Sequence, residues 1–179
     1  MNTLIDGIIY FGVIGVDQSH VEMQIEHLLK GGAIFSSYFS IDDNLKSLLK
    51  NKYPKAHDAK NFQELLDDDN IIGISVMEHG KDYFCDKPGF TNTKQLLRIK
   101  DIAARTNQVY SVFFSECSLS RSTIMVKELI DKGEIGNIVQ IINLGPHALR
   151  IDTRPSWFFD KALSGGILTF IGCHQFEQF

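Results

Sequence analysis

The sequence predicts an α/β protein with a parallel sheet that helices cover on both faces. Short apolar runs that suit strands alternate along the chain with amphipathic segments of helical spacing. The links between these segments are short, as in strand–helix–strand units. One strand-like run, IIGISV at 71–76, is apolar except for one serine, which is typical of strands buried on both faces.

Two strand–helix units open the chain. Residues 8–15 form an apolar run that ends in glycine, and residues 21–30 repeat apolar side chains at helical spacing. Residues 33–39 are apolar and aromatic enough for a second strand. Residues 44–52 carry three leucines on one face, and the two aspartates before them are candidate N-caps.

The alternation continues through the middle of the chain. Asn61 can cap a short helix through Leu66, an acidic turn follows, and the strand at 71–76 comes next. The remaining expected elements are strand 82–85, helix 93–105, strand 109–114 and helix 120–132.

One link in this series is too short. Residues 77–81 alone separate strand 71–76 from strand 82–85. Two parallel neighbouring strands need a crossover of about a dozen or more residues. Either these two strands are antiparallel, or a crossover helix is missing from the sequence at this point.

The alternation of short strands and amphipathic helices ends near Gly136. We therefore place a domain boundary near residue 134. Residues 138–144 (IVQIINL) form a longer strand-like run. A polar loop follows, and Gly165 and Gly166 then open an apolar helix that runs to Phe179. The prediction is a first domain at 1–134 and the beginning of a second at 135–179.

Composition excludes several classes of protein. Hydrophobic residues make up 44% of the 179 positions and charged residues 22%, which excludes a disordered chain or a disulfide scaffold. A net charge of −4 with dispersed basic residues argues against nucleic acid as a partner. No run approaches the ~18 apolar residues that a membrane span requires. Cys85, Cys117 and Cys173 lie in apolar stretches, which indicates buried thiols and a cytoplasmic protein without a metal site.

The turn after the first predicted strand is a candidate dinucleotide site. A glycine-rich turn before a helix lets backbone N–H groups and the helix N-terminus face a pyrophosphate. Here Asp17 stands where the second glycine of the fingerprint is expected, so an ordinary tight turn is the alternative. The candidate cofactor contacts of this turn are Gly12, Gly15, Val16, Asp17, Gln18 and Ser19.

The second strand ends at a candidate ribose contact. An acidic residue that holds the ribose hydroxyls is expected about 20 residues beyond the glycines. Ser40 stands there and could hydrogen-bond a ribose, whereas Asp42 and Asp43 better suit the N-terminal capping of the following helix.

The passage Asp86-Lys87-Pro88 follows the predicted strand 82–85. Open α/β sheets bind their ligands at the carboxyl ends of strands, so both Asp86 and Lys87 are candidate cofactor contacts. A lysine there can donate to a substrate oxygen and assist proton transfer, and Asp86 would help to keep it charged. A solvated surface lysine is the alternative.

The apolar helix after Gly166 would place Phe170 and His174 on one face, four residues apart. His174 is a candidate general acid or base, and the alternative is a hydrogen-bonded core histidine. The preceding loop carries His147, Arg154 and Trp157, which are candidate substrate contacts.

Taken together, these features resemble the Gfo/Idh/MocA family of NAD(P)-dependent oxidoreductases, which includes glucose-fructose oxidoreductase and inositol dehydrogenase. The matching passages are Gly12-Val-Ile-Gly15, NFQELLDDDNIIGISV, EHGKDYFCDKPGFTN, VKELIDKGEIGNIVQI, RPSWFFD and GGILTFIGCHQFEQF. The resemblance implies a Rossmann domain followed by an α/β domain with an open sheet that mediates contacts in a homo-oligomer, a dimer or tetramer. It also implies NAD or NADP as cofactor and hydride transfer to or from a sugar, cyclitol or related polyol.

The resemblance assigns catalytic roles to two residues. Lys87 occupies the lysine position of the family's Glu-Lys-Pro motif, with Asp86 in place of the glutamate. His174 occupies the histidine position, whereas Phe170 replaces the aspartate found four residues before it. The family also has a helix between strands 71–76 and 82–85, and its members continue beyond residue 179 for about as long again. The alternative function is a noncatalytic dinucleotide-binding or interaction protein that retains the fold.

Overall fold

The structure is a computed structural model that describes residues 7–15, 18–61, 64, 77–145 and 147–179. The chain divides into two compact units. The first comprises Met1–Phe84 and Ile99–Ser111, and the second comprises Cys85–Arg98 and Val112–Phe179. These units are discontinuous in sequence, and the domain boundary expected near residue 134 stays a prediction.

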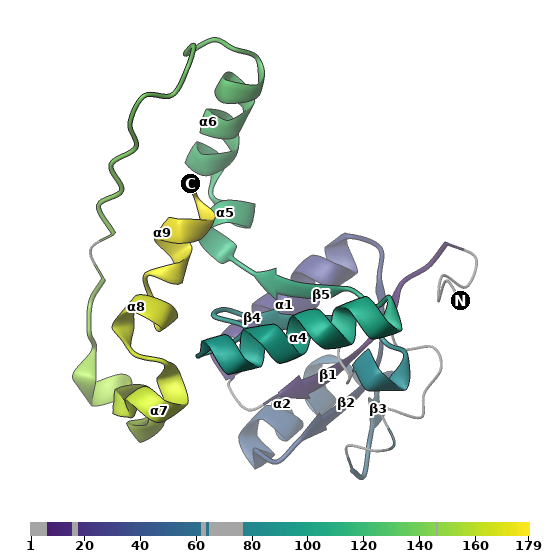
Figure 1. Cartoon of the computed structure of the whole chain (residues 1–179). Helices are drawn as coiled ribbons and strands as arrows, with labels where there is room; N and C mark the ends of the chain where they lie inside the picture. The colour runs from purple at the N-terminus through teal and green to yellow at the C-terminus, as the bar shows by residue number, and fades with distance from the viewer. Residues whose placement is uncertain (1–6, 16–17, 62–63, 65–76, 146) are drawn as a thin grey trace. The chain divides into compact units, whose positions relative to one another are not determined.

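A parallel sheet forms the centre of the first unit (Figure 1). Its strands lie in the order β1-β2-β3, and both neighbouring pairs are parallel. The elements are β1 (Tyr10–Gly15), α1 (Gln18–Lys30), β2 (Ile34–Ser40), α2 (Asp43–Lys52) and β3 (His57–Asp58). The predicted α/β class and the first two strand–helix units are therefore confirmed.

The core of this unit lies where α1 and α2 pack against β1 and β2. Leu45 and Leu49 are fully buried because they are one helical turn apart on the inner face of α2. Phe11 on β1 and Phe35 on β2 stack with ring centroids 5.1 Å apart. The other buried apolar members are Val13, Ile25, Ala33 and Tyr38. Burial of these side chains is the main stabilising contribution to the unit.

Asp42 is the N-cap of α2, as expected. Its Oδ1 accepts hydrogen bonds from the backbone N–H groups of Asn44 (2.8 Å) and Leu45 (3.0 Å). Asp42→Ala is expected to lower the free energy of unfolding by about 1 kcal/mol, because two N–H groups lose their acceptor. Chemical denaturation measures this loss. The matched control is Asp43→Ala, which removes an exposed aspartate of the first turn without removing a cap; an equal loss in both variants would contradict the capping role.

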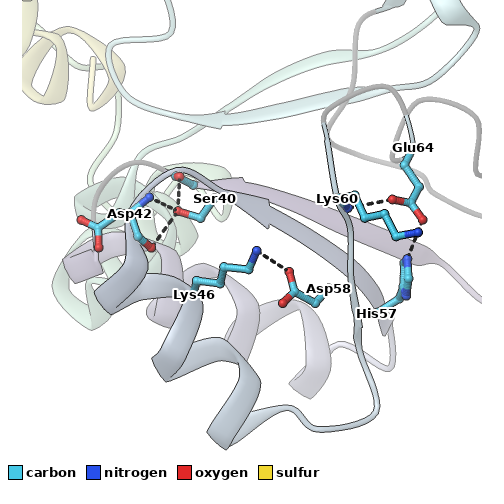
Figure 2. A network of polar contacts seen from close by, with 8 residues as sticks. Ser40, Asp42, Lys46, His57, Asp58, Lys60 and Glu64 are labelled. Carbon is cyan, nitrogen blue, oxygen red and sulfur yellow. Dashed lines mark hydrogen bonds and ion pairs between the residues drawn. The ribbon is translucent and has the colours of Figure 1, made fainter.

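β3 is too short to be recognised from the sequence. It consists of two residues paired with Ser37 and Tyr38 of β2. Asp58 forms an ion pair with Lys46 of α2 (3.1 Å), and His57 contacts Glu64 (2.9 Å) (Figure 2). These contacts hold the strand at the edge of the sheet.

A second sheet has two strands, β4 (Tyr83–Asp86) and β5 (Tyr110–Phe113), joined through α4 (Thr93–Thr106). All three agree with expected elements. The predicted strand 71–76 lies outside the described residues, and so does part of the predicted helix 61–66. Met77–His79, in the link that is too short for a crossover, forms a single 3-10 turn.

The second unit is mainly helical and irregular. Its helices are α5 (Ser115–Leu119), α6 (Arg121–Asp131), α7 (Lys161–Ser164), α8 (Ile167–Phe170) and α9 (Cys173–Glu177), with 3-10 turns at Ile151–Thr153 and Ser156–Phe159. Helix α6 was expected, and Ser120 caps it through the N–H of Thr123. None of the described helices has both the length and the apolar character needed to cross a membrane.

Two expectations for this unit are wrong. Residues 138–144 form no strand; they are extended and exposed, with Val139 96% exposed. A strand needs a neighbour to satisfy its backbone, and none pairs with this run in the described part of the chain. The apolar helix expected from Gly166 to Phe179 is broken into α8 and α9.

The cysteines also differ from expectation. Cys85, Cys117 and Cys173 form no disulfide, but each is partly exposed and not buried. Their apolar sequence neighbours therefore do not enclose them fully.

Candidate functional site

Lys87 is the most deeply buried lysine of the second unit, at 8% exposure, and directly follows β4. Its Nζ donates a hydrogen bond to the backbone carbonyl of Phe170 (2.9 Å) and lies 3.8 Å from the centroid of the Phe170 ring. Burial lowers the pKa of Lys87, while the charges of Cys173 and Asp86 oppose that shift. Asp86 therefore acts in the expected direction, but burial outweighs it.

The break between α8 and α9 makes the Phe170 carbonyl available to Lys87. In a continuous helix this carbonyl would accept from the N–H of His174. Here the N–H of His174 donates to the carbonyl of Ile171 (3.1 Å), and the carbonyl of Phe170 accepts from Nζ of Lys87 and from Sγ of Cys173 (3.5 Å). A Cβ on Gly172 would lie 2.5 Å from the Leu168 carbonyl, so glycine is required for the tight break. The prediction that residues 170 and 174 share one face of a continuous helix is therefore wrong, because the helix breaks between them.

Aromatic rings surround this lysine contact. The Phe170 ring packs edge-on against Phe158 and Trp157, with centroids 5.0 and 5.8 Å away. The Arg154 guanidinium lies over the Phe158 ring, 4.5 Å from its centroid. Two of the three candidate substrate contacts, Arg154 and Trp157, are thus gathered with Lys87 around one aromatic cluster, and Trp157 is 40% exposed.

His147, the third candidate substrate contact, is exposed and lies close to Ala148, with Nδ1 3.0 Å from that backbone oxygen. Its charge lowers the pKa of His174, which places it within electrostatic reach of that residue. Among the contacts of the described residues, none joins His147 directly to the aromatic cluster.

His174 is buried, at 8% exposure, and its partner is a residue that the sequence analysis did not single out. Nδ1 of His174 lies 2.6 Å from Oε2 of Glu116 on α5. The two atoms are in close contact, but the arrangement does not have the geometry of a hydrogen bond. The Phe114 ring packs edge-on against the imidazole, 6.0 Å away. No sequence signal links positions 116 and 174, which lie on separate helices.

Burial and charge set the protonation of this pair. Burial lowers the pKa of His174, and the Glu116 carboxylate opposes that shift. For Glu116, burial alone would raise the pKa, but hydrogen bonds from Ser115 and its own backbone N–H, with the charges of His174 and Lys87, lower it. The site therefore combines an ionised carboxylate with an imidazole that tends to be neutral.

A cavity of about 500 Å³ lies in the same unit. Its lining is mostly apolar and consists of Pro88, Phe90, Val112, Phe114, Leu168, Thr169, Cys173, Phe176 and Glu177. The side chains of Lys87 and His174 do not line it, so the cavity is not assigned to their chemistry. Among the described residues, no three His, Cys, Asp or Glu side chains converge on a possible metal position.

The candidate nucleotide site lies in the first unit. Gly15 ends β1 directly beside Ser40, which ends β2, so the carboxyl ends of the two strands meet. The Ser40 hydroxyl donates to the Gly15 carbonyl (2.9 Å) and accepts from the Asp42 N–H (3.0 Å), as Figure 2 shows for Ser40 and Asp42. Because its one hydrogen is used within the fold, Ser40 could meet a ribose hydroxyl only as an acceptor.

The other turn residues are placed as follows. Gly12 lies inside β1 opposite Ser37, before the turn. Val16 and Asp17 lie outside the described residues. Gln18 and Ser19 begin α1, a helix of 13 residues without an acidic residue in its first turn. Its N-terminus therefore keeps the positive end of the helix dipole beside the strand ends.

Comparison with known proteins bears on this arrangement. Residues 123–179 match the model of the GFO/IDH/MocA C-terminal domain. This part of the chain belongs to the Gfo/Idh/MocA family. The resemblance expected from the motifs is thus confirmed. A search of curated protein sequences finds no significant match.

Solved structures extend the likeness beyond the matched segment. A proposed oxidoreductase from Erwinia carotovora atroseptica SCRI1043 is similar at 32% identity and a TM-score of 0.87, over 96% of this chain and 55% of that one. A myo-inositol 2-dehydrogenase from Lactobacillus plantarum is similar at 20% identity and a TM-score of 0.77, over 95% and 55%. The WlbA dehydrogenase from Thermus thermophilus, in complex with NAD and UDP-GlcNAcA, gives 16% and 0.70, over 95% and 61%. The chain therefore spans somewhat more than half the length of these family structures.

Phe170→Asp is expected to raise the pKa of Lys87, because a carboxylate beside the ammonium favours its charged form and replaces an apolar ring. NMR titration of the lysine Cε resonances measures the change. Phe170→Asn is the matched control, since it has the same shape without the charge. Equal Lys87 pKa values in the two variants would show that residue 170 does not act on the ammonium by charge.

Proposed function

We propose that the protein is an NAD(P)-dependent oxidoreductase that transfers a hydride between the nicotinamide cofactor and a hydroxyl-bearing carbon of a sugar, cyclitol or related polyol. The observation that carries the proposal is the buried pair of proton-handling groups, Lys87 and His174, in one compact unit of a chain with a family match. The similar dehydrogenase structures support the same reaction class.

The residues of the first unit fit a dinucleotide. The backbone N–H groups at the start of α1, from Gln18, would face the pyrophosphate, and Gly15 and Ser40 would flank it at the strand ends. When bound, the nicotinamide supplies the hydride acceptor for alcohol oxidation. NAD and NADP both remain candidates, since Ser40 carries no charge that would repel a ribose phosphate.

The residues of the second unit handle the proton. In alcohol oxidation the C–H hydride leaves carbon, the O–H proton leaves oxygen, and a carbonyl forms. The Lys87 ammonium would donate a hydrogen bond to the reacting oxygen. Because Nδ1 of His174 faces Glu116, Nε2 is the ring nitrogen left to accept the hydroxyl proton. A pKa lowered by burial keeps the imidazole neutral and able to act as the base.

The test combines cofactor binding with turnover. NADH and NADPH should bind with enhanced nicotinamide fluorescence, and a panel of sugars, cyclitols and sugar acids with NAD⁺ or NADP⁺ should give reduced nicotinamide for at least one substrate. Binding without turnover would favour the noncatalytic alternative. That alternative has one supporting observation: Phe170 covers one side of the Lys87 ammonium. Failure of both nucleotides to bind would reject the oxidoreductase.

A further inference from the structure

The contact between Glu116 and His174 offers the histidine a carboxylate that position 170, four residues before it, does not supply. Nδ1 of His174 is fully buried and lies 2.6 Å from Oε2 of Glu116. The Glu116 side chain is 49% exposed, while the His174 side chain is 9% exposed. The carboxylate thus belongs to a side chain that is partly exposed to solvent, and it contacts an imidazole that is buried in the protein.

Local structure prepares Glu116 for this contact. It lies in the first turn of α5, and the Ser115 hydroxyl donates to the same oxygen, Oε2, at 2.7 Å. That hydrogen bond restricts the carboxylate, and it also favours the ionised form. The carboxylate is therefore held in place and charged at the pH where a base is needed.

Four charged or titratable groups act on His174 from the elements around it. Glu116 from α5 and Asp86 from the end of β4 favour the imidazolium, while Lys87 and His147 disfavour it. Glu116 has the largest effect of the four. Phe170, in the position four residues before His174, provides no charge.

We propose that Glu116 is the positioning residue of His174: it orients the imidazole so that Nε2 faces the substrate, and it stabilises the imidazolium formed when that nitrogen takes the substrate proton. The proposal rests on the proposed oxidoreductase function. The carboxylate comes from another helix, and this explains how the site can work with an aromatic residue at position 170. A carboxylate 2.6 Å from Nδ1 also favours the tautomer that carries its proton on that nitrogen.

The decisive variant is Glu116→Gln, which keeps the size of the side chain and removes the charge. Glu177→Gln on α9 is the matched control, because it makes the same change at another exposed glutamate of the same unit. Two measurements are made on each protein. NMR titration gives the pKa of His174, with its resonance assigned by loss in His174→Gln, and steady-state kinetics give kcat and KM against pH.

Removal of a charge that raises the His174 pKa must lower that pKa, so the titration of Glu116→Gln should move to lower pH. The limb of the kcat profile that reports His174 should move in the same direction. We expect kcat to fall by roughly 10- to 100-fold, a part of the ~10²- to 10⁴-fold contribution of an acid–base group, with KM nearly unchanged. Glu116→Asp should restore part of the His174 pKa and part of kcat. Glu177→Gln should match the wild type in both measurements.

An unchanged His174 pKa in Glu116→Gln would overturn the proposal, as would a lowered pKa with wild-type kcat. A protein without dehydrogenase activity would reject the proposed function. In that case the NMR titration, which needs no substrate, would still decide whether Glu116 controls the protonation of His174.

Discussion

Lys87→Met and His174→Ala are each expected to lower turnover by ~10²- to 10⁴-fold, the usual cost of removing a positioned acid–base group. Lys87→Met keeps the length and apolar character of a side chain that packs against the Phe170 ring at 3.8 Å. His174→Ala removes the imidazole that faces Glu116. Steady-state kinetics on the polyol substrate identified in the binding and turnover screen measure both effects.

Cofactor affinity should stay within roughly tenfold in both variants, because neither residue is assigned to the pyrophosphate. If Lys87 and His174 serve the same proton transfer, the turnover of the double variant should be only slightly lower than that of the less active single variant. The matched control is Lys161→Met, a lysine of α7 in the same unit that carries no proposed role in the chemistry. Wild-type turnover in either Lys87→Met or His174→Ala would remove that residue from the mechanism.

Gly15→Val is expected to abolish dinucleotide binding and to destabilise the first unit. A side chain here would block the approach of a pyrophosphate to the turn. The structure adds a second cause, because a Cβ on Gly15 would lie 2.6 Å from Cδ2 of Leu45, which is fully buried. Overpacking at such a position costs roughly 1–3 kcal/mol. Chemical denaturation and fluorescence titration with NADH or NADPH measure the two effects.

Leu45→Ala separates these causes. It should lose roughly 2–5 kcal/mol of stability by leaving a cavity, yet keep the glycine turn and therefore the affinity for the dinucleotide. The double variant Gly15→Ala, Leu45→Ala should recover packing space at residue 15 and still bind weakly. Full dinucleotide affinity in Gly15→Val, measured where the variant is folded, would place the nucleotide away from this turn.

Periodicity predicted the two strand–helix units at the start of the chain. The glycine at the end of the first apolar run and the leucines of residues 44–52 indicated β1 and α2, and the structure has both within two residues of the expected bounds. Asp42 was recognised as a cap because an N-cap side chain bonds backbone N–H groups only two and three residues away. Local patterns suffice when the forces that form an element act within a few residues.

The same reasoning failed for two segments of the second unit. Residues 138–144 have the composition of a strand, but a strand also needs a partner for its backbone, and none of the described residues pairs with it. The apolar pattern after Gly166 suited a continuous helix, yet Gly172 allows a break and the buried Lys87 ammonium takes the carbonyl of Phe170. Neither the missing strand partner nor the hydrogen bond from Lys87 can be recognised from the local sequence.

Residue chemistry alone indicated the candidate groups Lys87 and His174, because an Asp-Lys-Pro passage after a strand and a histidine in a glycine-bounded apolar segment carry distinctive residue types. Their surroundings were decided by tertiary structure. Glu116, 58 positions before His174 in the chain, becomes its carboxylate partner only because α5 and α9 pack together. Charge acts through space over a few ångströms, so the protonation of a buried group depends on neighbours that the order of the sequence does not reveal.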